Sequence, residues 1–366
     1  MATCHRICTR LFRMRPGKVI CGFMTVIFCI YIAISLSLDL ASIKNDTVSI
    51  ANSKIESYHQ LFLKGKWIVI PRTVNESLNT KHTNSTKSSY KRSLCHTFVG
   101  RLGNTMFQYA SIYSVGRING FRLVMSSSYN LTDIFSNLVE SSNSFRPCLY
   151  YTKLFERDPY QFESTITSLP NDTDYLVEGF FQSWRYFEPF KTEIHRQFTF
   201  KKRVAYMAKF SLEAALDNFR RTRNLTIPIR TYVGIHVRRG DYVKLLHSRS
   251  VGINLPTSTY FETAKNYFRS LYRSPVFIVC SDDIAWCENN IGTDDAVFIR
   301  GNAPEVDLAI LASLNHTITS FGTFTFWAAW LANGTTVYPK TIVDENFGDR
   351  RDIYLRDHVY PTWIPL

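Results

Sequence analysis

The 366-residue sequence lacks the short signatures that most directly assign a chemistry. There is no GxxxxGKS/T loop, which excludes a Walker-type phosphate site, and no CxxC pair, which excludes the common cysteine metal and redox motifs. Internal repeats and heptads are also absent. The formal net charge is +13 at pH 7, yet the chain has no long lysine run and no recognisable nucleic-acid module. We therefore expect no nucleic-acid partner.

Charged residues are absent from residues 19–38, an apolar stretch long enough to span about 30 Å of hydrocarbon as a helix. Five basic residues and no acidic one precede this stretch, and Asp39 follows it. The positive-inside rule then places residues 1–18 in the cytosol and the body of the protein in the lumen or outside. A cleaved signal peptide is the alternative, but its apolar core usually has only about 7–15 residues. We expect a retained transmembrane anchor.

Two further patterns favour a secretory compartment. N-x-S/T triplets, the acceptors of N-glycosylation, occur at Asn45, Asn75, Asn84, Asn130, Asn171, Asn224, Asn315 and Asn333. The body of the chain also carries an even set of cysteines: Cys95, Cys148, Cys280 and Cys287. These four are expected either to form two disulfides or to pack as buried thiols.

Residues 39–93 are rich in Ser, Thr, Asn and Lys and contain a single apolar cluster. Such a composition buries too little apolar area to offset the entropy of ordering. We interpret this segment as a stem that holds the body away from the bilayer.

The last third of the sequence alternates short apolar runs with segments of helical periodicity. The run 231–238 is followed by a helix-like segment near 258–272. Four further apolar runs, with helix-like segments after the second and the third, reach residue 339. Such alternation is typical of a parallel, doubly wound sheet. A weaker version begins near Leu94, whereas residues 130–199 are aromatic and irregular. We predict an α/β fold with two Rossmann-like lobes, residues 94–225 and 226–366, facing a cleft.

The stretch "IHVRRGDY" places two arginines where a buried strand ends. Open α/β sheets bind ligands at the carboxyl ends of their strands. Adjacent strand positions point to opposite faces, so Arg238 and Arg239 converge on one ligand only where the chain leaves the strand, which Gly240 permits. Because the arginine fork matches phosphate oxygens, we predict a diphosphate site. A surface salt bridge with Asp241 is the alternative.

Two stretches supply further candidate phosphate ligands. "VGRLGNTMFQYA" places Arg101 and Asn104 at the start of a helix, whose N-terminus attracts anions; the alternative is a glycine-rich turn with Asn104 as N-cap. "SFGTFTFW" opens another helix, where Ser320 and Thr323 are expected to hold phosphate. The aromatic residues of that helix, Phe324, Phe326, Trp327 and Trp330, have the spacing of a buried core.

Asp282 and Asp283 end the next strand, in "CSDD". An acidic residue at this position in a nucleotide-binding sheet commonly receives ribose hydroxyls or base N–H groups. A Mn²⁺ or Mg²⁺ site is the alternative, but the carboxylates are adjacent and the arginines already supply positive charge. We expect no metal and no other cofactor.

Five motifs in order resemble the α-1,2-fucosyltransferases, an inverting GT-B-type family that uses GDP-fucose. They are "GRLGNTMFQYA", "GFFQSWRYF", "GIHVRRGDYV", "FIVCSDDIAWC" and "DLAILASLNHTITSFGTFTFWAAWLA", within residues 94–366. Residues 1–93 resemble the family's type II anchor and stem. The resemblance implies that His236, Arg238, Arg239 and Asp241 belong to the donor site. The chain departs from the family at Thr105, usually a glutamine, and in "SFGTF", more often "STFSWW".

The resemblance implies a Golgi membrane enzyme that moves fucose from GDP-fucose to the 2-hydroxyl of a galactose-terminated glycan on a glycoprotein or glycolipid. We expect Arg239, Arg101, Asn104 and Asp241 to be catalytic, because fixed guanidinium groups stabilise a departing diphosphate. Asp241 is either the base or a group that orients Arg238 or Arg239, and a phosphate oxygen of the donor is the alternative proton acceptor. The rival functions are a fucosyltransferase forming another linkage and an inactive, membrane-anchored glycan-binding protein.

Overall fold

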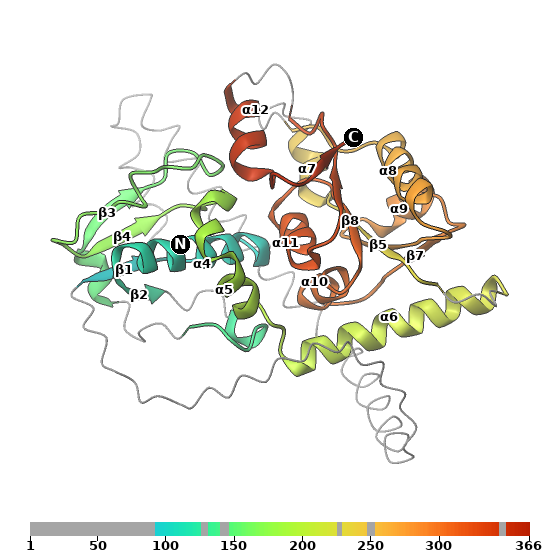
Figure 1. The fold of residues 1–366 in the computed structure, drawn as a ribbon, viewed down its shortest axis with the longest axis horizontal. Helices are drawn as coiled ribbons and strands as arrows, with labels where there is room; N and C mark the ends of the chain where they lie inside the picture. Colours follow the sequence, from blue (N-terminus) through green and yellow to red (C-terminus); the bar gives the residue numbers. More distant parts are fainter. Residues whose placement is uncertain (1–91, 126–130, 140–145, 225–228, 247–252, 344–348) are drawn as a thin grey trace, which may run out of the picture. The chain divides into compact units, whose positions relative to one another are not determined.

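The computed structural model describes residues 92–125, 131–139, 146–224, 229–246, 253–343 and 349–366 (Figure 1). The expected tail (1–18), anchor (19–38) and nearly all of the stem lie outside the described residues, as do Asn45, Asn75, Asn84 and Asn130. Within the described ranges no helix is both long and apolar enough to cross a bilayer. The other four glycosylation candidates, Asn171, Asn224, Asn315 and Asn333, are exposed to solvent.

The first lobe is built on a four-stranded parallel sheet in the order β2-β1-β4-β3. Its strands are β1 (Ser93–His96), β2 (Arg122–Met125), β3 (Thr152–Phe155) and β4 (Tyr175–Glu178). Helix α4 (Leu102–Asn119) connects β1 to β2 and ends at Gly120, whose φ of 70° is easy for glycine. The short strand, glycine-bearing turn, helix and strand expected near Leu94 are confirmed.

The irregular stretch of the first lobe contains β3 and β4 and otherwise forms short helices separated by loops. These are η1 (Leu131–Asp133), η2 (Arg146–Tyr150), η3 (Trp184–Tyr186), η4 (Glu188–Phe190) and α5 (Lys191–Gln197). Aromatic side chains beside these helices pack on α4, where Phe187 contacts Phe107 and Phe198 contacts Tyr109. Both also contact Trp327 of the second lobe. The aromatic content of this segment therefore builds core, although it carries no strand or long-helix periodicity.

The second lobe is a six-stranded parallel sheet in the order β10-β9-β8-β5-β6-β7 (Figure 1). Its strands are β5 (Tyr232–Val237), β6 (Val276–Ser281), β7 (Ala296–Phe298), β8 (His316–Ile318), β9 (Thr336–Tyr338) and β10 (Ile364–Pro365). The helices are α7 (Gly240–Leu246), α8 (Ser258–Leu271), α9 (Ile284–Asn290), α10 (Pro304–Ala312) and α11 (Thr323–Ala332). The predicted doubly wound α/β sheet is confirmed.

Both faces of this sheet are covered, as continuous apolar strands require. On one face Ile235 and Val279 pack with Phe261 and Phe268 of α8. On the other, Ile278 belongs to the cluster that contains the buried side chains of α10 and α11. The carboxyl edge of the sheet is therefore the place where its loops gather polar side chains.

Two segments link the lobes. Helix α6 (Lys202–Thr222) precedes β5 but packs against α10 of the second lobe. The second segment lies between β9 and β10 of the second lobe and consists of α12 (Asp349–Ile353) and the π-helical turn η6 (Tyr354–His358). Although both flanking strands belong to the second lobe, η6 packs on η3 of the first. The expected lobe boundary at 225/226 falls in residues 225–228, outside the described part of the chain.

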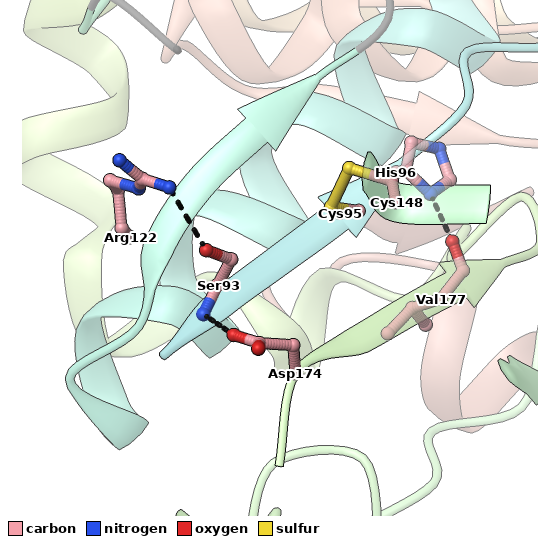
Figure 2. Close-up of a disulfide and its surroundings, with 7 residues drawn as sticks. All are labelled: Ser93, Cys95, His96, Arg122, Cys148, Asp174 and Val177. Atoms are coloured by element: carbon pink, nitrogen blue, oxygen red, sulfur yellow. Dashed lines mark hydrogen bonds between the residues drawn. A yellow bond between two sulfur atoms is a disulfide. The ribbon is translucent and has the colours of Figure 1, made fainter. Parts of the chain in front are cut away.

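One of the two expected disulfides is formed. Cys95 of β1 is bonded to Cys148 of η2, as Figure 2 shows beside the hydrogen bond from His96 Nδ1 to the carbonyl of Val177 (2.8 Å). Cys280 and Cys287 are buried free thiols. They belong to the hydrophobic clusters on opposite faces of the second sheet, which explains why they do not pair.

Candidate active site

The candidate site lies at the carboxyl ends of β8, β5 and β6, which are neighbours in the second sheet. In the parallel register Val237 of β5 is opposite Ser281 of β6, so the residues that follow them emerge side by side. Arg238 and Arg239 follow β5, Asp282 and Asp283 follow β6, and Ser320 lies just beyond β8. The sequence prediction that these residues gather at one edge is confirmed.

Arg238 is held from three directions. Its backbone N–H donates to Ser320 Oγ (3.0 Å), and its guanidinium pairs with the carboxylates of Asp241 and Asp282. Gly240 leaves room for this ion pair, because a Cβ at this position would press on the Asp282 carboxylate and the Arg238 guanidinium. The salt bridge to Asp241, considered above as an alternative to ligand binding, is therefore present.

Arg239 is fixed by the chain that follows β6. Its backbone N–H donates to Asp282 Oδ1 (2.9 Å), and its Nε donates to Asp283 Oδ2 (3.2 Å). The guanidinium carbon lies 4.1 Å from the centre of the Trp286 ring, a cation–π contact. Asp283 is also the N-cap of α9 and accepts the Trp286 N–H (3.2 Å). Both acidic residues thus bond to arginine.

His236 of β5 is buried beneath this cluster. Its ring centre lies 4.6 Å from that of Phe324, and its Nδ1 has no hydrogen-bond partner among the described residues. Burial, with a smaller contribution from the charge of Arg238, lowers the pKa of His236 to about 3. The imidazole is therefore neutral at physiological pH and has an unused ring nitrogen.

The first lobe contributes Arg101 and Asn104. Arg101 Nη2 lies 4.0 Å from Asp241 Oδ2, and Asn104 Oδ1 accepts hydrogen bonds from Thr323 Oγ1 (2.7 Å) and Gln182 Nε2 (3.3 Å). Asn104 is not the N-cap of α4, as the alternative interpretation had it: the helix begins at Leu102, with Arg101 as N-cap. Its side chain is thereby free to join the lobes.

Close contact of two helices makes this junction. A Cβ on Gly103 would lie 2.5 Å from the backbone N of Phe324, and Trp327 Nε1 donates to the Gly103 carbonyl (3.1 Å). The N-termini of α4 and α11 therefore meet backbone to backbone. The predicted core role of the α11 aromatics is confirmed for Phe326, Trp327 and Trp330, which are buried, whereas Phe324 is half-buried.

The assembled cluster is formally charge-balanced. Three arginines (Arg101, Arg238 and Arg239) face three aspartates (Asp241, Asp282 and Asp283). Each guanidinium has five N–H donors in a fixed fork, so partners other than these aspartates can be bonded as well. Within the described ranges, no group of three His, Cys, Asp or Glu side chains has a metal-binding arrangement.

Sequence reasoning missed Gln182 and Trp286. Gln182 lies in the motif "GFFQSWRYF", within the segment whose structure the pattern did not resolve. Trp286 had a usable signal, because it stands one helical turn after the capping Asp283 and so faces back toward the strand end. His236, Ser320 and Thr323 lie where they were expected, although Ser320 and Thr323 are bonded to Arg238 and Asn104.

Comparison with known proteins gives consistent relatives. Galactoside alpha-(1,2)-fucosyltransferase 2 of Sus scrofa is 36% identical over 253 residues, which cover 66% of this chain and 70% of the relative. Galactoside alpha-(1,2)-fucosyltransferase 1 of Homo sapiens is 33% identical over 269 residues, 68% of each chain. Among solved structures, an Arabidopsis thaliana FUT1 mutant in complex with GDP has 12% identity and a TM-score of 0.46, covering 71% of this chain and 72% of that one. The model of glycosyl transferase family 11 matches residues 68–362, and the chain belongs to that family.

Proposed function

We propose that the protein is an inverting fucosyltransferase that transfers fucose from GDP-fucose to the 2-hydroxyl of a galactoside on a glycoprotein or glycolipid. Family membership and the named activities of the relatives support this reaction class. The proposal includes a GT-B arrangement with the donor on the second lobe, and a type II anchor that keeps the catalytic part in the Golgi lumen. The apolar stretch at residues 19–38 and the eight glycosylation triplets support that location.

The observation that carries the proposal is the convergence of Arg101, Arg238 and Arg239 from two lobes on one strand edge. Cleavage of the bond between fucose and phosphate leaves negative charge on GDP. Guanidinium groups held in place before the reaction stabilise that charge without reorganising. They supply the role that a divalent cation has in other transferases, so we propose that transfer requires no metal.

Asp241 fits an orienting role better than that of a base. It contacts the guanidinium groups of both Arg238 and Arg101. Both of its carboxylate oxygens are thereby occupied, Oδ1 by Arg238 and Oδ2 by Arg101. We therefore propose that Asp241 holds the two arginines toward the diphosphate, while attack by the acceptor hydroxyl on the opposite face of the sugar inverts the anomeric centre.

One assay tests these elements together. The purified, secreted chain from residue 39 is incubated with GDP-fucose and an array of galactose-terminated glycans, with and without EDTA, and the product linkage is mapped by NMR. We expect an α-1,2 linkage and EDTA resistance. A different linkage would overturn the acceptor assignment, whereas binding of GDP-fucose or glycan without transfer would indicate an inactive binding protein. Loss of activity with EDTA that only Mn²⁺ or Mg²⁺ restores would overturn metal independence.

A further inference from the structure

Glu156, the residue after β3, lies outside the arginine–aspartate cluster described above. It bonds to the turn at residues 179–182, which leads to Asn104 of the candidate site. Its Oε2 accepts the N–H groups of Phe180 (2.6 Å) and Phe181 (3.0 Å), and its Oε1 accepts Phe181 N–H as well (2.9 Å). Gly179 leaves room for this carboxyl group, because a Cβ there would lie 2.5 Å from Glu156 Cβ. One side chain thus fixes two successive amides of the turn after β4.

That turn has an unfavourable backbone conformation. Phe181 has a φ of 51°, in the left-handed region that bulky residues rarely adopt. It is completely buried, and its carbonyl accepts a hydrogen bond from Ser111 Oγ of α4 (3.0 Å). A non-glycine residue stays in this region only where its surroundings hold it there. The Glu156 carboxyl group is one of the groups that do so.

The turn delivers Gln182 to the junction between the lobes. Gln182 N–H donates to the carbonyl of Pro159 (2.8 Å), and its own carbonyl accepts from His358 Nδ1 (2.6 Å). Its side-chain Nε2 then reaches Asn104 Oδ1 (3.3 Å), the atom that also accepts from Thr323. A change in the conformation at Phe181 would therefore rotate Gln182 away from Asn104.

We propose that Glu156 is a positioning residue for sugar transfer, holding the 179–182 turn so that Gln182 keeps Asn104 in its working orientation. This inference rests on the proposed function, in which Asn104 contributes to catalysis. Glu156 acts through Gln182 and does not itself contact the reacting groups.

The ionisation of Glu156 suits a structural acceptor. Burial raises its pKa to about 8, with the Phe181 and Phe180 amides opposing the shift and the carboxylates of Glu163 and Asp158 adding to it. A largely protonated carboxyl group keeps one carbonyl oxygen, and Oε2 alone reaches both amides. Glutamine presents a similar oxygen, so Glu156→Gln is expected to preserve the turn and Glu156→Ala to release it.

The first experiment does not depend on activity. Hydrogen exchange of the Phe180 and Phe181 amides, followed by mass spectrometry of the full chain, should be slow in the wild type and in Glu156→Gln and much faster in Glu156→Ala. The control is Glu163→Ala, which removes a neighbouring carboxylate that accepts Arg157 N–H (2.7 Å). Unchanged exchange in Glu156→Ala would overturn the inference whatever reaction the enzyme catalyses.

The second experiment is a double-mutant cycle on fucose transfer. We expect Glu156→Ala to lower kcat by about tenfold or more, with little change in KM for GDP-fucose, and Gln182→Ala to do the same. Combining them should lower kcat no further, because both act through Asn104. The positioning role would be overturned if the two losses in kcat multiplied in the double variant, or if Glu156→Ala had the kcat of the wild type. If Glu156→Ala does not fold, Glu156→Asp, which is one methylene shorter, takes its place. A wild-type enzyme without transfer activity would instead refute the proposed function.

Discussion

Arg239 is oriented by contacts within the protein itself. Its Nε donates to Asp283, its backbone N–H donates to Asp282, and its guanidinium lies over Trp286. Arg238 is likewise held by Asp241 and Asp282. A guanidinium whose plane is already fixed loses less rotamer freedom when it binds an anion. At the scale of single residues, the cluster is therefore a preorganised receptor for an anion whose oxygens match the guanidinium fork.

Replacing Arg239 by lysine separates charge from geometry. Lysine keeps the positive charge but loses the fork and the stacking on Trp286. We expect Arg239→Lys to lower kcat/KM by at least about tenfold, or about 1.4 kcal/mol, with little change in Tm, and Arg238→Lys to behave similarly. Arg203→Lys, on the exposed face of α6, is the control. Normal kinetics in both site variants would refute diphosphate binding, and loss of folding in both would assign the arginines a purely structural role.

Secondary structure was predictable wherever apolar runs alternate with helical periodicity. The strand expected at 231–238 is β5 (Tyr232–Val237), and the helix expected from Pro304 begins there. Buried parallel strands and amphipathic helices impose different periods, so their order could be seen in the sequence. Residues 130–199 gave no such pattern, because their short helices are held by aromatic packing between distant segments, such as Phe135 on Phe198 and Phe187 on Trp327.

The gathering of the site residues was predictable for the same topological reason. Residues that follow neighbouring parallel strands must emerge at one edge, which brings Arg238, Asp282 and Ser320 together. The partner of each side chain was not predictable. The contact of Asn104 with Gln182 joins residues 78 positions apart, and nothing in the local pattern of either motif specifies that distance.

The contact between α4 and α11 gives a test at the scale of elements. In Gly103→Ala the new Cβ would meet the backbone at Thr323 and Phe324, which cannot move without separating the two helices. We expect kcat/KM to fall by about tenfold or more. Gly116→Ala is the matched control in the same helix, since its Cβ would meet the flexible end of the Leu123 side chain. Equal activity of the two variants, both folded by circular dichroism, would contradict this view of the helix contact.

At the scale of the whole molecule, the C-terminal segment ties the two lobes together. Asp357 is fully buried and accepts hydrogen bonds from Arg185 (2.9 Å) and from Phe162 N–H (3.0 Å) of the first lobe. The chain then returns to the second lobe, where β10 pairs with β9. Buried polar groups of the C-terminal segment therefore hold the two lobes together, and a change in their protonation changes the stability of that link.

His358 makes this link sensitive to acid. Burial lowers its pKa from 6.5 to about 4, against the weaker effect of its bond to the Gln182 carbonyl. The imidazole of His358 therefore binds a proton more tightly in the unfolded chain than in the folded protein. The stability that the neutral imidazole contributes is present above about pH 6.5 and is lost as the pH falls toward 4. The full contribution is on the order of 3 kcal/mol.

Urea unfolding at about pH 7 and about pH 4.5 measures this contribution. Between these two pH values we expect the unfolding free energy of His358→Asn to fall less than that of the wild type. His236 and His96 are present in both proteins, so the difference between the two reports on His358. Equal pH dependence of the two proteins would show that His358 is not the group responsible.

The anchor prediction also belongs to the whole chain. Replacing residues 1–38 by a cleavable signal should give a secreted, active enzyme, because the family match begins at residue 68 and no site residue precedes Arg101. Digestion of the full-length, membrane-inserted protein with an N-glycosidase should lower its apparent mass, since four triplets are exposed on the described surface. An inserted protein that carries no glycan would place the body on the cytosolic side.

The Cys95–Cys148 bond has a practical consequence for anyone who prepares this protein. It ties β1, next to the buried His96, to η2 across 53 residues of sequence, in a small cluster with Val124 and Leu176. A host cytosol keeps thiols reduced, whereas a secretory route oxidises them. Two preparations with one sequence but different hosts would then be different covalent species even after their glycans are removed, because only one of them has this bond. A titration of free thiols distinguishes them, and their activities should be compared only after that result is known.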